Sequence, residues 1–227
     1  MSRLVTILGR TLRQQRESRE LTQRELADLA GVSQTAVARI ERGDRSPGVP
    51  LLERLLAAID VQLAVAVEPL DAHLDAAMTD LAARPVADRI DALNLDRLLD
   101  RLGDLPYVVT GATAAVLPGA PVPVEATEVA VRWRDSARFT RWLEAAYGRR
   151  WNARWSEFGG LHVDPAEPGE HRWRTRYGEI RATMCDELPD AVEVRHGERG
   201  YRVVPVVELE VTDPRAAALL RRWRERR

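Results

Sequence analysis

Residues 21–45 read LTQRELADLAGVSQTAVARIERGDR, and this stretch predicts two short helices joined by a sharp turn. Thr22 fits the N-cap of the first helix, and Glu25, three residues later, completes a capping box. Gly31 stands where the chain must turn, and Ser33 caps the second helix. Apolar residues fall on the facing sides of the two helices: Leu21, Leu26, Ala27 and Ala30 on the first, and Val37 and Ile40 on the second.

The second helix leaves a polar face pointing outward. This face carries an amide, a hydroxyl, a small residue and two guanidinium groups, from Gln34, Thr35, Ala38, Arg39 and Arg42. Such side chains bond to base edges and phosphates. The pattern is therefore typical of a helix-turn-helix and makes double-stranded DNA the leading partner.

Residues 3–60 resemble the Xre/Cro repressor family. The resemblance rests on the helix order and on the motifs T-Q-x-E-L-A, S-Q-x-x-V-x-R-I-E and G-D-R-S-P. It implies an all-α DNA-binding domain of four to five helices over residues 1–60. A preceding helix carries the apolar stripe Leu4, Leu8 and Leu12, and SPGVPLLERLLAAID forms a following helix with Leu52, Leu55, Leu56 and Ile59 inward.

The same resemblance implies which residues meet DNA. Gln34, Thr35 and Arg39 would face the major groove, and Arg42 and Arg45 the flanking backbone. Arg16 and Gln23 would either meet phosphate or brace the recognition helix. In phage repressors of this type an arginine on the first helix pairs with the glutamate that ends the recognition helix, and Arg16 and Glu41 stand at those places. The full DNA-binding set is Arg16, Thr22, Gln23, Ser33, Gln34, Thr35, Ala38, Arg39, Arg42 and Arg45. The alternative is a domain of this type that has lost DNA and binds only protein.

Length and composition set further bounds. With 227 residues the chain has room for two modest domains. Its one cysteine, Cys185, excludes an intramolecular disulfide and a cysteine metal cluster. No apolar run approaches the ~20 residues of a membrane span, and the N-terminus does not read as a signal peptide. We therefore expect a cytoplasmic protein that does not engage membranes.

The charge is unevenly distributed along the chain. Residues 1–50 carry nine Arg against six acidic residues, whereas residues 61–104 carry four Arg against nine. All 34 basic residues are Arg, which indicates a GC-rich genome as much as a nucleic-acid partner. Only the N-terminal part is therefore expected to attract DNA.

Residues 61–68 predict a dimerisation strand. Val61, Leu63, Val65 and Val67 alternate with smaller or polar residues, and an unpaired apolar strand needs a neighbour. The simplest neighbour is the same strand of a second subunit, and HipB-like antitoxin repressors, which the chain resembles here, dimerise in this way. The alternative is that the strand extends the sheet of the C-terminal domain.

An acidic helical connector is expected to follow up to residue 104, with helices over 70–83 and 85–102. From residue 105 the pattern alternates between strands and helices, which predicts a mixed-sheet domain over 105–227 and an α+β chain overall. We expect helices at 111–117 and 136–147, and a last helix capped by Asp213. Strands are expected at 107–110, 128–133, 161–163, 172–176, 179–184, 192–195 and 202–207.

Residues 107–133, YVVTGATAAVLPGAPVPVEATEVAVRW, resemble the nucleotidyltransferase fold of minimal nucleotidyltransferases and AbiEii-like toxins. In that fold a strand leads into G-S or G-G at a helix start, and the next strand carries D-x-D. Paired carboxylates hold Mg²⁺ against the triphosphate, and a third on a later strand completes the site.

This chain departs from that pattern. Gly111 is followed by Ala112 in place of serine, and Glu128-Val129-Ala130 keeps one acid of the pair. The later strand offers Glu179, but Arg181, next on that face, would repel a metal ion. We therefore expect no catalytic residue, no metal and no cofactor, and the chain is not expected to be an enzyme.

A degenerate pocket could still bind a nucleotide or another small anionic effector. Its candidate residues are Gly111, Thr113, Glu128, Arg132, Glu179 and Arg181. The alternative is a rigid body that binds a cognate partner protein or a second subunit. Cys185 is expected to be buried, and His162, His171 and His196 lack metal-ligand spacing.

Together these features predict a homodimeric, sequence-specific repressor of transcription. Its two recognition helices would enter major grooves about 34 Å apart on a near-palindromic operator. The alternative is a toxin–antitoxin component, either an antitoxin or an active nucleotidyltransferase.

Overall fold

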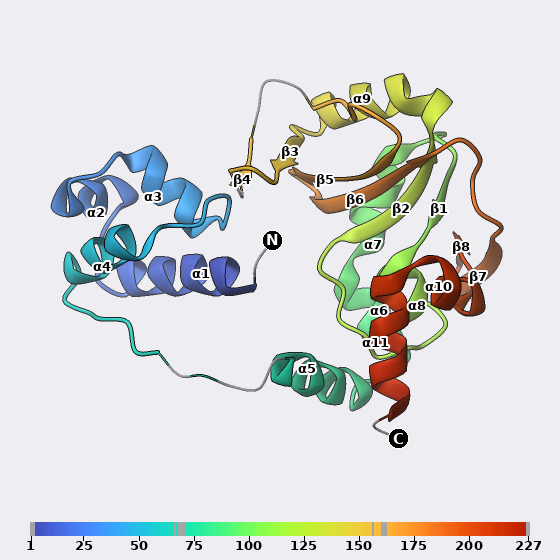
Figure 1. The fold of residues 1–227 in the computed structure, drawn as a ribbon, viewed down its shortest axis with the longest axis horizontal. Coiled ribbons are helices and arrows are strands. Elements are labelled where there is room, and N and C mark those ends of the chain that lie inside the picture. Colours follow the sequence, from blue (N-terminus) through green and yellow to red (C-terminus); the bar gives the residue numbers. More distant parts are fainter. Residues whose placement is uncertain (1–2, 66, 68–70, 156, 160–162, 226–227) are drawn as a thin grey trace. The chain divides into compact units, whose positions relative to one another are not determined.

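The structure is a computed structural model that describes residues 3–65, 67, 71–155, 157–159 and 163–225. The chain is α+β, as expected, and it divides into two compact units (Figure 1). The first unit contains Met1–Val67 and Trp151–Gly160, and the second contains Glu68–Arg150 and Leu161–Arg227. Ten residues from the C-terminal half of the sequence thus belong to the first unit.

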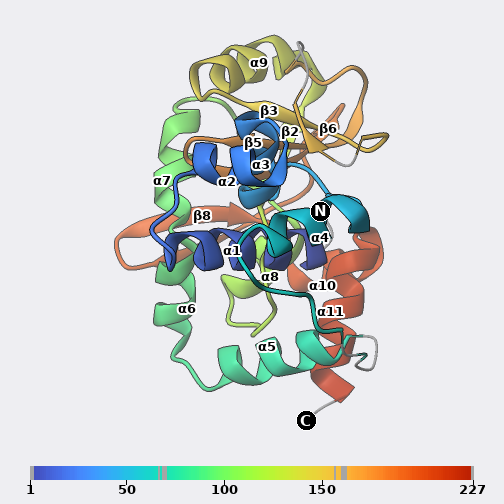
Figure 2. The same cartoon turned by 90° about the vertical axis from the view of Figure 1, so that its left-hand side faces the viewer.

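Helices α1 to α4 build the first unit (Figure 2). They span Arg3–Glu17, Gln23–Ala30, Gln34–Glu41 and Val49–Ala57. Their apolar faces meet in one core, which includes Leu12, Leu26, Val37, Ile40, Leu52, Leu55, Leu56 and Ile59. The inward positions predicted for α3 and the segment from α4 to Ile59 are confirmed.

The predicted stripe on α1 was partly wrong. Leu12 is fully buried and Leu8 packs at the edge of the core, but Leu4 is 61% exposed, and Val5 is buried in its place. The inward face follows residues 5, 9, 12 and 16, a spacing of three to four residues that fits a helix. It passes through Gly9, where an added Cβ would lie 2.3 Å from the carbonyl oxygen of Ile40. Helix α1 therefore approaches the end of α3 very closely.

The segment that follows α4 forms no strand in the described residues 61–65 and 67. Val61 packs against the first core, whereas Val65 and Val67 are strongly exposed. None of these described residues is in a strand of the sheet, and extension of the sheet stays an untested alternative. Pairing with a second subunit stays a prediction, in part because residues 66 and 68 lie outside the described residues.

Within the described residues, eight strands form one mixed sheet in the order β4-β3-β5-β6-β2-β1-β8-β7. β1 (Tyr107–Val109) runs antiparallel to β2 (Thr127–Arg132), and β2 runs parallel to β6 (Gly178–Cys185). β5 (Gly169–Thr175) forms a hairpin with β6, and β7 (Val192–His196) forms one with β8 (Arg199–Val203). β3 (Arg149–Asn152) and β4 (Glu157–Phe158) were not predicted.

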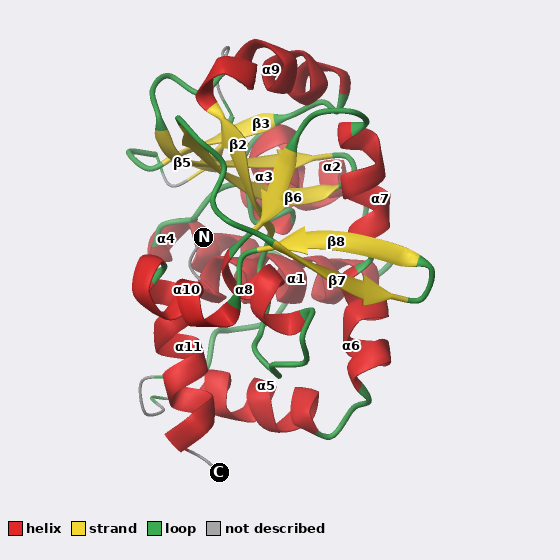
Figure 3. Ribbon diagram, turned by 90° about the vertical axis from the view of Figure 1, so that its right-hand side faces the viewer, coloured by secondary structure: helices red, strands yellow, loops and turns green. Residues whose placement is uncertain are grey.

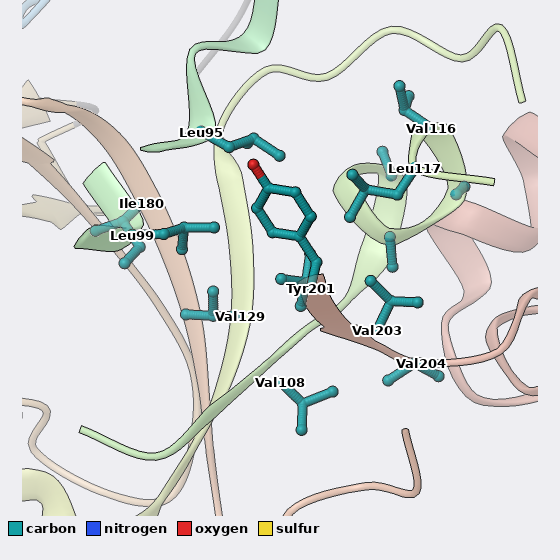
Figure 4. Packing of buried hydrophobic residues seen from close by; sticks show 14 of the residues in the cluster. Leu95, Leu99, Val108, Val116, Leu117, Val129, Ile180, Tyr201, Val203 and Val204 are labelled. Atoms are coloured by element: carbon teal, nitrogen blue, oxygen red, sulfur yellow. The ribbon is translucent and has the colours of Figure 1, made fainter. Parts of the chain in front are cut away.

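Helices α5 (Ala72–Ala82), α6 (Val86–Leu93) and α7 (Leu95–Leu99) and the 3-10 helix η1 (Asp100–Leu102) occupy the predicted connector. They do not stand apart, because Ile90, Leu95, Leu98, Leu99 and Leu102 are buried in the same core as the strands. Figure 4 shows Leu95 and Leu99 near Val129, Ile180 and Tyr201. The compact second unit therefore begins well before residue 105.

The remaining helices are α8 (Gly111–Val116), η2 (Trp133–Asp135), α9 (Ser136–Ala145), α10 (Val206–Thr212) and α11 (Pro214–Glu225). Residues 206–207, predicted as the end of a strand, begin α10, because the chain turns at Pro205. Asp213 caps α11 as predicted, accepting hydrogen bonds from the amides of Arg215 and Ala216. Of the predicted strand at 161–163, residues 161–162 lie outside the described residues, and Val163 is not in a strand.

Candidate nucleic-acid interface

Local hydrogen bonds fix the α2–turn–α3 unit. The Thr22 hydroxyl accepts from the Glu25 amide at 3.2 Å, and the Glu25 carboxylate accepts from the Thr22 amide at 2.7 Å. These bonds lower the pKa of Glu25. Gly31 closes α2 with φ +63°, and the Ser33 hydroxyl accepts from the Ala36 amide at 3.2 Å. All three predicted caps are present.

A buried polar brace joins α1, α2 and α3. The Arg16 guanidinium donates to both carboxylate oxygens of Glu41, at 2.6 and 2.9 Å, and to the Leu21 carbonyl at 2.6 Å. The Gln23 amide donates to the same Glu41 carboxylate at 2.8 Å. The hydrogen bond to Glu41 raises the pKa of Arg16, and burial of the guanidinium acts in the opposite direction. In this arrangement Arg16 and Gln23 brace the recognition helix through Glu41, and Arg16 is too buried to contact a phosphate.

The outward face of α3 presents polar groups to solvent. Ser33, Gln34, Thr35 and Arg42 are exposed, and Ala38 and Arg39 are half-buried. The Arg42 side chain donates to buried Asp44 at 2.9 Å, which holds its stem against the turn after α3. Arg45 lies exposed on that turn, and Thr22 is exposed at the start of α2. The predicted DNA-binding set, apart from the brace, thus lies at solvent-accessible positions of one small domain.

One contact on this face was not predicted. The Glu157 carboxylate of β4 lies 2.7 Å from the Arg39 guanidinium, and the two side chains are 23% and 30% exposed. The Phe158 amide donates to the Asp44 carbonyl at 3.1 Å. Phe158 is buried and packs edge-on against Trp151 at 5.1 Å. We call residues 151–159 the arm, of which residue 156 lies outside the described residues. The sequence gives little indication of this contact, because Trp151 and Phe158 are residue types that usually belong to a hydrophobic core.

The six predicted pocket residues of the second unit fall into separate groups. Glu128 accepts from the Ala112 amide at 2.5 Å and from Arg181 at 2.6 Å, and Thr113 hydrogen-bonds to the Glu128 amide. An added Cβ at Gly111 would lie 2.0 Å from Glu128, so only glycine fits there. Arg132 pairs instead with Asp135, and Glu179 with Arg172 and Arg174.

Glu128 is therefore committed to internal partners. Burial raises the pKa of its carboxyl, and Arg181 and the Ala112 amide act in the opposite direction. Arg181 stands directly opposite Glu128 in the β2–β6 register, and Ala130 opposite Thr183. No group of three or more metal-binding side chains exists among the described residues.

A cavity of about 450 Å³ lies nearby and is lined by Ala130, Thr183 and Cys185. Its charged lining is mostly acidic, with Glu170, Glu187, Glu208 and Asp213 against Arg215, and it is therefore poorly suited to a nucleotide triphosphate. Cys185 is half-buried rather than buried, and desolvation raises the pKa of its thiol.

The capped turn, the brace and the exposed polar face of α3 define a helix-turn-helix domain. A helix-turn-helix family matches residues 12–65 of the chain. Over 59 residues the chain is 36% identical to a protein named as an uncharacterized HTH-type transcriptional regulator, y4dL, of Sinorhizobium fredii. That match covers 26% of this chain and 30% of the relative. The family match lies within the first unit. Among the described residues, no helix has the length and apolarity needed to cross a bilayer.

Proposed function

We propose that this protein is a sequence-specific regulator of transcription that binds double-stranded DNA through α3. The observation that carries the proposal is the braced helix-turn-helix with Gln34 and Thr35 exposed on its outward face. The match to a helix-turn-helix family and a relative named as a regulator support it. Repression is the expected outcome, since a protein bound at a promoter blocks access to it.

The first experiment is a genome-wide pull-down of DNA with the tagged full-length chain, which yields the operator. Fluorescence anisotropy at one fixed salt concentration then measures affinity for that operator and for random duplex. Arg39→Ala should cost about 1–3 kcal/mol on the operator and relax preference at one base pair. Equal loss on random duplex would reject base reading by Arg39.

Arg45 supplies the contrasting expectation. Arg45→Ala should weaken operator and random duplex alike and lower the slope of log affinity against log salt by about 1. Arg54→Ala is the matched control, because it removes the same charge from an exposed position on α4. A similar slope change in the Arg54 variant would mean that Arg45 has no phosphate contact of its own.

We also propose that the regulator is a homodimer joined through residues 61–68. The exposed apolar side chains of Leu63, Val65 and Val67 support this, because such alternation needs a covering partner. Sedimentation of Val65→Asp should show monomers where the natural chain sediments as a dimer. Val49→Asp, at another exposed valine, is the control, and an unchanged dimer in the Val65 variant would contradict this interface.

For the second unit we propose a catalytically inactive relative of nucleotidyltransferases that binds a ligand or a partner protein. The β1–α8–β2 order with a parallel β6 supports the kinship. The Glu128–Arg181 pair and Ala130 support the loss of metal chemistry. Incubation with labelled nucleoside triphosphates, Mg²⁺ and tRNA should give no covalent transfer, and any Mg²⁺-dependent transfer would contradict inactivity.

A further inference from the structure

A second cavity, of about 440 Å³, lies within the second unit and has no part in the site described above. Its walls come from α5, α6, α11 and the loop after α8, through Met78, Thr79, Arg89, Gly119, Pro121 and Trp223. Figure 3 shows α5 between α6 and α11. We call this cavity the Arg89 pocket. Its volume is in the range that proteins use for small organic ligands.

Arg89 is the unusual member of this wall. The residue is 8% exposed, and its Nη1 donates to the Gly119 carbonyl at 3.0 Å. Its Nε is buried and has no hydrogen-bond partner among the described residues. Nor does any carboxylate of the described chain lie within ion-pair distance of it. A buried guanidinium in this state has lost its hydration without gaining a counter-charge, which is costly.

Arg16 of the first unit is a buried arginine whose charge is balanced. Arg16 is buried to the same degree, and its guanidinium binds both oxygens of Glu41. The second unit places Arg89 in an equally dry position and supplies one neutral carbonyl. What is missing at Arg89 is a planar anion of the kind that Glu41 provides to Arg16.

The nearby acids do not supply that anion. On α5, Asp75 is paired with Arg222 at 2.6 Å, and the same arginine contacts Asp71 at 3.5 Å. On the same helix, Asp80 pairs with Arg84 at its exposed end. The lining residues of the Arg89 pocket therefore contribute one positive charge and no negative charge, which complements a ligand of charge −1.

The rest of the wall combines apolar side chains with polar atoms, among them the hydroxyl of Thr79. Met78 is almost fully buried, and Trp223 packs against the core of the second unit. Pro121 adds a further apolar surface, and the Thr79 hydroxyl donates to the Asp75 carbonyl of its own helix. The apolar side chains of Met78, Pro121 and Trp223 can pack against an apolar body attached to the anionic group.

We propose that the Arg89 pocket binds a small organic monocarboxylate, with the carboxylate on Arg89 and an apolar, flat body against Met78, Pro121 and Trp223. A monocarboxylate fits better than phosphate, because a single guanidinium balances its one charge and these three side chains can cover its body. The proposal goes beyond DNA binding and is tested without DNA, so its failure leaves the proposed regulator intact.

The test uses the full-length chain with benzoate and indole-3-acetate as probes, and their uncharged amides as matched controls. Isothermal titration and thermal shift should detect both acids, with the amides at least tenfold weaker. Inorganic phosphate, tested in parallel, should bind at least tenfold more weakly than the better acid. Binding of acids and amides alike, or of none of the probes, would overturn the proposal, as would tight binding of phosphate with no binding of the acids.

Two variants separate a ligand-binding arginine from a structural one. Arg89→Met should weaken carboxylate binding at least tenfold yet leave the ligand-free melting temperature unchanged or higher, because the buried charge has no counter-charge to lose and gives up one hydrogen bond to a neutral carbonyl. Arg89→Lys keeps the positive charge but loses the two parallel N–H donors of the guanidinium, and this variant should bind the acids with intermediate affinity. If Arg89→Met or Arg89→Lys binds the acids as tightly as the natural chain, Arg89 does not hold the carboxylate. If Arg89→Met lowers the melting temperature and the natural chain binds no acid, the residue is structural and the proposal fails.

Discussion

Glu157→Gln should strengthen operator binding, because it removes the carboxylate that holds Arg39. The two side chains lie 2.7 Å apart and are about a quarter exposed, so DNA must displace Glu157 before Arg39 can reach a base. Partly exposed ion pairs contribute about 0.2–1 kcal/mol, which corresponds to a gain of roughly 1.5- to fivefold in affinity. The glutamine keeps the shape of the arm and the Phe158–Asp44 backbone bond.

The assay is fluorescence anisotropy on the operator at constant salt concentration. Glu53→Gln, an exposed position on α4, is the matched control for the loss of one negative charge near DNA. In a double-mutant cycle, Glu157→Gln should give no gain once Arg39 is alanine. If the Glu157 variant binds the operator no more tightly than the natural chain, the arm does not compete with DNA for Arg39. If the Glu53 variant gains affinity to the same extent, the gain comes from the change in net charge and not from the loss of the Arg39–Glu157 pair.

Three further substitutions test the first unit by urea unfolding. Gly9→Ala should lower the free energy of unfolding by about 1–3 kcal/mol, because its methyl group would meet the Ile40 carbonyl. Thr11→Ala, at an exposed position on α1, is the control. If the Gly9 variant is as stable as the natural chain, α1 can shift away from α3 without cost. Thr22→Ala removes the hydroxyl cap of α2 and should lower the free energy of unfolding by about 1 kcal/mol. Thr22→Ser keeps the hydroxyl and should lower it far less. If the two variants lose the same stability, the cap is not the cause. Glu41→Gln leaves the Arg16 charge buried without its counter-charge and should cost about 3–5 kcal/mol. If Glu41→Gln unfolds like the natural chain, the brace does not hold α3.

The helix-turn-helix could be predicted because its signals are local. Thr22 and Glu25 close a capping box within one turn, Gly31 adopts a left-handed conformation that glycine favours, and the apolar residues follow the helical period. The Arg16–Glu41 pair is long-range, and it was predicted through the family resemblance rather than from the pattern alone.

The arm and the true extent of the second unit were missed for a different reason. The Arg39–Glu157 pair joins parts of the chain that are far apart in sequence, and no local pattern records such a contact. Leu98, Leu99 and Leu102 lie in the helix predicted over 85–102, but helical periodicity does not say which core a helix faces. Val206 and Val207 favour a strand by propensity, yet Pro205 turns the chain into a helix.

The grouping of the predicted pocket residues of the second unit could be foreseen only in part. Gly111, Thr113, Glu128 and Arg181 do come together, as the motif implied. Arg132 and Glu179 do not join them, because Asp135 of η2 pairs with Arg132, and two arginines of the adjacent strand β5 pair with Glu179. Adjacent ion pairs of this kind depend on register, which the sequence did not specify.

The Glu128–Arg181 pair also shapes how this unit could change over generations. Restoring an aspartate at Ala130 would still leave Glu128 neutralised by its neighbour, and replacing Arg181 first would strand a dry carboxylate in the interior. Each single step toward a magnesium centre is thus either without benefit or harmful to folding. On the proposed kinship with nucleotidyltransferases, this ion pair therefore opposes the return of a metal site.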